Sequence, residues 1–85
     1  MASSNENIGL LIRTYRAKAG LTQLELAQAL GYANPQFVYL IECGKSKVPM
    51  YLLKKLIATL KIPERKVIDV LVGEYRKKLE IEVVN

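Results

Sequence analysis

The stretch from Leu21 to Gly44, LTQLELAQALGYANPQFVYLIECG, decides how this chain folds. Thr22 is a good helix cap, because its hydroxyl can accept a backbone N–H that the first helical turn leaves unpaired. One apolar stripe then follows at helical spacing, formed by Leu24, Ala27 and Leu30. Gly31 supplies the backbone freedom that a sharp exit from a helix requires. The pattern predicts a short helix near residues 23–30.

A second short helix is predicted directly after the turn. Asn34 caps well, and Pro35 suits the first helical position because the amide hydrogen that it lacks would have no partner there. Apolar residues three apart, Val38 and Ile41, face inward, and Gly44 ends the helix near residue 43. Two helices this short, joined by so brief a connection, must cross at a steep angle. The stretch is therefore a helix-turn-helix.

Composition indicates one small folded domain. Of the 85 residues, 51% are hydrophobic and 25% are charged, which is typical of a globular chain rather than a disordered one. The longest apolar runs have only a few residues, so no membrane span is expected. The polar start MASSNEN predicts that no signal peptide is present.

The cysteine and histidine content excludes several kinds of site. The chain has one cysteine and no histidine, so an internal disulfide, zinc sites and His-based catalysis are excluded on composition. The expected compartment is a reducing cytoplasm, in association with the nucleoid. No constellation of nucleophile, base and oxyanion donors is found, and we expect neither an enzyme nor a cofactor.

The positive charge lies in one part of the chain. The formal net charge is +5, and residues 1–61 hold eight basic and three acidic residues, whereas residues 62–85 hold five of each. The helix-turn-helix therefore lies in the part of the chain that carries the excess positive charge. This distribution favours a polyanion, nucleic acid, as the partner of the first part and a different role for the second.

The flanking sequence predicts three more helices. An amphipathic first helix ends at Gly20; its cap is either a Ser3–Glu6 capping box or Asn7, and its apolar stripe is Ile8, Leu11, Ile12, Tyr15 and Ala19. Pro49 opens a fourth helix, which carries Leu52, Leu53, Leu56, Ile57 and Leu60 inward. Pro63 then begins the fifth helix. The expected fold is all-α, with five helices.

The fifth helix has more apolar surface than its own domain needs. A helical wheel places Val67, Ile68, Leu71, Val72, Tyr75 and Leu79 on one broad face and leaves Val70 and Ile81 outside it. We expect this surplus to form a dimer contact, with Val67, Val70, Leu71, Tyr75 and Leu79 as its residues; otherwise the helix folds back over the core. Residues 79–85 alternate between apolar and polar and fit either a helix or a short strand.

Residues 8–62 resemble the phage repressor and Cro-like helix-turn-helix proteins, also called the XRE family. The matching text is Ile12-Arg13-x-x-Arg16, Gly20-Leu21-Thr22-Gln23, Leu26-Ala27, Leu30-Gly31, Ile41-Glu42-x-Gly44-Lys45 and Pro49…Leu53…Leu60-Lys61-Ile62. The resemblance implies a lambda-repressor-like domain over 8–62. The rest divides into a disordered or frayed N-terminus, 1–7, and a C-terminal dimerisation element, 63–85.

The resemblance also implies roles for single residues. Gln23 looks like the residue that grips a DNA phosphate and braces the recognition helix, and the 35–43 helix looks like that recognition helix, which docks in the major groove. Arg16 and Glu42 look like the structural ion pair between the first and third helices. The expected DNA-binding residues are Thr22, Gln23, Asn34, Gln36, Phe37, Tyr39, Leu40, Lys45 and Lys47.

The expected function is a transcriptional regulator that binds a palindromic operator in double-stranded DNA as a homodimer. One alternative is a protein-interaction adaptor, because Phe37, Tyr39 and Leu40 make the third helix unusually apolar and would meet either thymine methyl groups or a protein. Another alternative is RNA or non-specific nucleic-acid binding through charge alone.

Overall fold

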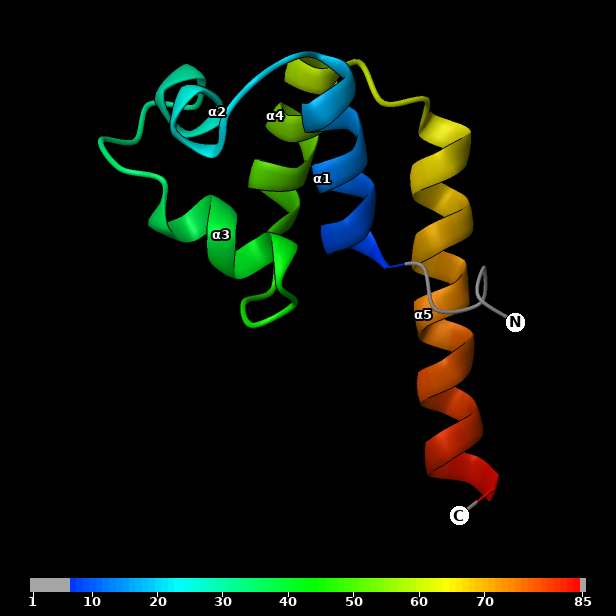
Figure 1. Ribbon diagram of the computed structural model, residues 1–85. Coiled ribbons are helices and arrows are strands. Elements are labelled where there is room, and N and C mark those ends of the chain that lie inside the picture. The colour runs from blue at the N-terminus through cyan, green and yellow to red at the C-terminus, as the bar shows by residue number, and fades with distance from the viewer. Residues whose placement is uncertain (1–6, 85) are drawn as a thin grey trace.

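The computed structural model describes residues 7–84, which form five helices (Figure 1). They are α1 (Ile8–Lys18), α2 (Gln23–Ala29), α3 (Gln36–Glu42), α4 (Met50–Leu60) and α5 (Glu64–Val84). The described residues contain no strand, so the predicted all-α, five-helix architecture is confirmed. None of the helices in this part of the chain is long and apolar enough to cross a membrane.

Side-chain caps determine where the first two helices begin. Asn7 Oδ1 accepts the Leu10 amide hydrogen at 2.9 Å, so Asn7 is the cap of α1, and the Ser3–Glu6 alternative lies outside the described residues. At α2, Thr22 Oγ1 accepts the Glu25 amide hydrogen at 3.0 Å while Glu25 Oε1 accepts that of Thr22 at 2.9 Å. This reciprocal capping box satisfies donors that the first turn leaves unpaired.

The third helix begins one residue later than the sequence predicts. Pro35 precedes α3, and Asn34 Oδ1 accepts the amide hydrogen of Gln36 at 3.0 Å. The asparagine therefore still caps the helix, but it does so across the proline. The expectation that Pro35 is the first helical residue is wrong by this one position.

One apolar core holds the helices together. Its buried residues come from all five helices, from Leu30 at the end of α2 and from Ile62. They are Leu11, Ile12, Leu26, Ala27, Leu30, Val38, Ile41, Leu52, Leu53, Leu56, Leu60, Ile62, Val67 and Val70. Leu24 departs from the prediction, because 41% of it is exposed and Leu26 takes the inner position instead. At the centre of the fold α1 crosses α3 so closely that a Cβ atom on Gly9 would collide with the carbonyl oxygen of Ile41.

The last helix packs on the core with its first half and extends past the other helices with its second (Figure 1). The described chain is helical to Val84, so the strand alternative for residues 79–84 is wrong; Asn85 lies outside the described residues. The placement of Val70 also needs correction, since it is buried in the core whereas Ile68 and Val72 are exposed. The core lies to one side of the widest apolar face of the helix.

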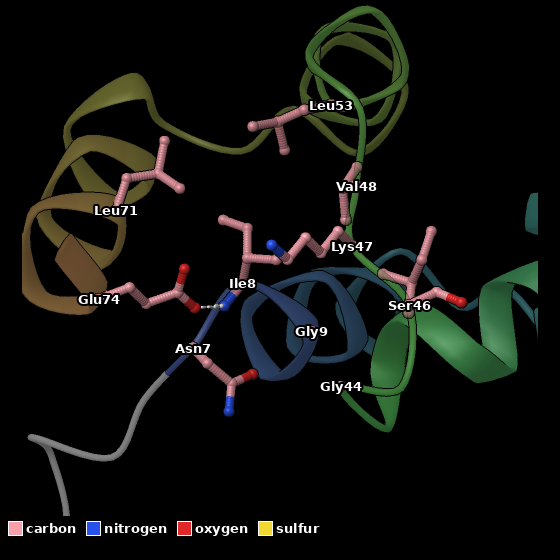
Figure 2. A pocket seen from close by; sticks show the side chains of 11 residues that line it. Asn7, Ile8, Gly9, Gly44, Ser46, Lys47, Val48, Leu53, Leu71 and Glu74 are labelled. Carbon is pink, nitrogen blue, oxygen red and sulfur yellow. Dashed lines mark hydrogen bonds between the residues drawn. The ribbon is translucent and has the colours of Figure 1, made fainter. Parts of the chain in front are cut away.

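A glutamate side chain of the last helix forms a hydrogen bond with the start of the first helix. Glu74 Oε2 accepts the amide hydrogen of Ile8 at 3.0 Å, and Figure 2 shows this bond at the start of α1. The Ile8 amide is one of the donors that a helix cannot satisfy internally, and a carboxylate also suits the positive end of the helix dipole. The bond fixes how α5 lies along the molecule.

Two glycine-to-alanine substitutions test this packing. Gly9→Ala should lower the free energy of unfolding by at least about 2 kcal/mol, because backbone atoms of α3 block the new methyl group. Gly73→Ala is the matched control on α5: nothing lies within 4 Å of its Cβ position, so removing a mid-helix glycine should raise stability by about 0.5–1 kcal/mol. Urea unfolding measures the free energy of unfolding of both variants. A Gly9→Ala variant that is as stable as the wild type would contradict the close crossing.

Candidate nucleic-acid interface

Three polar side chains meet where α1, the start of α2 and the end of α3 come together. Arg16 Nε and Nη2 donate to Glu42 Oε2 and Oε1 at 2.6 and 3.0 Å, and Gln23 Nε2 donates to Glu42 Oε1 at 3.0 Å. Arg16 Nη1 also donates to the carbonyl oxygen of Leu21 at 2.8 Å. The hydrogen bond that Arg16 donates to Glu42 is the main reason that the pKa of Arg16 lies above its ordinary value, and burial opposes it.

This network fixes the orientation of α3. Only 4% of the Glu42 side chain and 15% of the Arg16 side chain are exposed, so the pair is largely shielded from water. A bidentate arginine–carboxylate pair restricts the angle as well as the distance between its partners. Gln23 braces α3 in the way the resemblance implies, and because an amide nitrogen carries two hydrogens, one donor remains for a phosphate.

The exposed side of α3 carries the residues expected to meet DNA. Gln36 and Tyr39 are exposed and Leu40 is half-buried, whereas Val38 is buried in the core. Tyr39 interacts with Cys43, and a hydrogen bond with that side chain raises the pKa of the Tyr39 phenol. A phenol is protonated at neutral pH even at its ordinary pKa, so the Tyr39 hydroxyl can act as a donor.

Phe37 lies differently from the other α3 candidates. Its ring packs on Tyr32 from the turn, with ring centroids 4.1 Å apart and planes tilted by 38°. Burial raises the pKa of Tyr32, and neighbouring Tyr51 from α4 raises it further. The aromatic cluster of Tyr32, Phe37 and Tyr51 thus joins the turn, α3 and α4. Sequence reasoning missed this cluster, because Tyr32 and Tyr51 belong to no helical stripe.

The remaining predicted DNA-binding residues are two helix-capping residues and two lysines in the loop after α3. The side-chain oxygens of Thr22 and Asn34 accept backbone amide hydrogens, so their predicted DNA contacts would use the hydroxyl hydrogen and the amide NH₂. Lys45 and Lys47 are both exposed in the loop after α3. Figure 2 shows the Lys47 side chain pointing into a pocket of about 430 Å³ between that loop, the start of α1 and α5.

The structure does not bring the five predicted dimer residues onto one surface. Val67 and Val70 are buried in the core of their own chain, and Leu71 is half-buried against it. Tyr75 and Leu79 are exposed, by 65% and 42%. A helical periodicity alone does not tell which of two adjacent apolar faces packs on the core.

The short crossed pair α2 and α3, braced through Gln23 and Glu42 against α1, defines a helix-turn-helix protein. Comparison with protein families matches residues 12–67 to the helix-turn-helix family, and the chain belongs to its XRE branch, the Cro and phage-repressor type. Proteins of this family are DNA-binding transcription regulators, and membership assigns the chain to that class. Comparisons with curated proteins and with solved structures each found no match.

Removing the central carboxylate tests the brace. Glu42→Ala leaves Arg16 without its shielded partner, and we expect the free energy of unfolding to fall by about 3 kcal/mol. Arg13→Ala on the exposed side of α1 is the control, and it should change stability by less than about 0.5 kcal/mol. Equal losses in the two variants, measured by chemical denaturation, would argue against a structural role for the ion pair.

Proposed function

We propose that this protein is a sequence-specific DNA-binding transcriptional regulator that acts as a homodimer on a two-fold symmetric operator. The observation that carries this proposal is the exposed α3, held rigidly by Arg16, Gln23 and Glu42. A helix fixed in this way presents its first turn to the major groove in one defined orientation. Two-fold symmetry follows from pairing two such chains, whose recognition helices would then meet half-sites about one DNA turn apart.

The contacts divide into those that read bases and those that hold the backbone. Gln36 stands at the start of α3 with an exposed side chain, and its amide offers the donor–acceptor pair that suits adenine, with roughly 1–3 kcal/mol of discrimination for a good pair. Tyr39 follows on the same exposed side. Gln23 and Lys45 lie beside α3 in the chain's basic part and are suited to phosphates.

A second candidate function is protein binding through the apolar surface beside α3. The exposed fractions of Tyr32, Tyr39, Met50 and Tyr51 are 38%, 45%, 61% and 63%. Aromatic and methionine side chains are enriched at protein interfaces. We rank this adaptor function below DNA binding, because it leaves both the excess positive charge and the exposed Gln36 without a role.

Selection of bound sequences from a random DNA pool, at about physiological salt, tests the proposal. The expected result is a motif with two-fold symmetry. Binding that selects no motif and disappears as the salt concentration rises would leave only counterion-driven attraction. A symmetric motif would exclude the adaptor as the main function.

Two substitutions separate base reading from phosphate contact. Gln36→Ala should flatten the preference at one operator position while affinity for random DNA stays close to wild type. Lys45→Ala should weaken binding to every sequence and reduce the slope of log affinity against log salt by about one. The measurement is a salt titration on the operator and on a scrambled duplex. The same loss on both duplexes for both variants would contradict the assignment of Gln36.

A further inference from the structure

The fifth helix carries a second apolar stripe, separate from the face that packs on the core. Ile68, Val72, Tyr75 and Leu79 follow one another at intervals of four, three and four residues, and their exposed fractions are 57%, 49%, 65% and 42%. Apolar residues repeating every three and a half residues are the seam of a coiled coil. We call these four residues the α5 seam.

The seam and the core contact use different sides of the helix. Val67, Val70, Leu71 and Glu74 face the core or α1, and at 100° per residue the seam lies about 120° further round the helix. The far half of α5 extends beyond the other helices (Figure 1), so no described part of this chain covers the seam there. Occupying the seam would leave the bond between Glu74 and Ile8 in place.

We propose that α5 pairs antiparallel with α5 of a second copy of this chain, with Ile68 opposite Leu79 of that copy and Val72 opposite its Tyr75. The inference rests on the proposed homodimer and specifies its interface. The two-fold axis lies between the two helices, at the level midway between residues 73 and 74 of each. Each contact therefore occurs twice. In this arrangement every exposed seam residue has an apolar partner.

The flanking charges select the antiparallel direction. Asp69 and Arg76 are both exposed and border the seam on the same side. An antiparallel pair places Asp69 beside Arg76 of the second copy, twice by symmetry. A parallel pair would instead place Glu64 beside Asp69 of the second copy, also twice, and like charges across a seam disfavour that alignment.

Disulfide trapping in the full-length chain distinguishes the two directions. The exposed Cys43 is first replaced by serine, and two variants are made that carry either Ile68→Cys or Leu79→Cys. In the antiparallel pair, residue 68 of one chain faces residue 79 of the other, within disulfide reach. Residues 68 of the two chains would then lie roughly 16 Å apart along the helix axis. Oxidation should therefore crosslink the mixture of both variants and neither variant alone.

Each other outcome has a definite meaning. Crosslinking of either variant alone would overturn the antiparallel register in favour of a parallel one. A wild-type dimer by light scattering, with no crosslink in the mixture, would overturn this interface and leave the homodimer of the proposed function intact. A wild-type monomer at tens of micromolar would overturn both the interface and the homodimer, whereas sequence selection by DNA would still report on α3.

A charge reversal gives an independent readout. Arg76→Asp should raise the dissociation constant of the dimer about tenfold, because two attractive pairs become repulsive, and adding Asp69→Arg should restore it. Lys66→Asp is the matched control: it makes the same change in charge on an exposed position away from the seam, and dimerisation should not change. An equal loss in Arg76→Asp and Lys66→Asp, or no rescue by the double variant, would count against the register.

Discussion

The contact on which the rest of the structure depends is the bidentate ion pair between Arg16 and Glu42. It joins the first helix to the end of α3 across 26 residues, and Gln23 adds the start of α2 to the same carboxylate. Helices of seven residues are not stable alone in water, so α2 and α3 owe their existence to packing and to such contacts. Charged groups in this setting specify geometry more than they add stability, because desolvation offsets much of their attraction.

Much of the fold could be predicted from the sequence, because local chemistry decides where the helices begin and end. Thr22 with Glu25, Asn7 and the glycines place the helix ends within a residue or two. The site could be predicted only in part. The ion pair came from a family resemblance, since no local rule links residues 26 apart. The direction of Lys47 and the contact between Tyr32 and Phe37 depend on tertiary packing, which periodicity does not encode.

The fifth helix shows most clearly where sequence reasoning stops. Its apolar residues form two stripes about 120° apart on the helix, one with Val67 and Val70 and one with Ile68 and Val72. In the structure the stripe with Val67 and Val70 meets the core, and Glu74 on the same side of the helix bonds to the amide of Ile8. The other stripe is then presented outward on a helix that extends well past the domain. In the proposed dimer, one element would thus serve both folding and assembly.

The close crossing of α1 over α3 at Gly9 affects how much conformational entropy the protein would lose when it binds DNA. With no side chain at Gly9, the two backbones come so close that even a methyl group there would collide with the carbonyl oxygen of Ile41. In the proposed function, α3 would therefore be preorganised when it meets DNA. The backbone ordering takes place during folding, and binding needs to immobilise only exposed side chains such as Gln36 and Tyr39. Under the proposed function, a rigid α3 would discriminate through fit, because its backbone could not adapt to a wrong sequence.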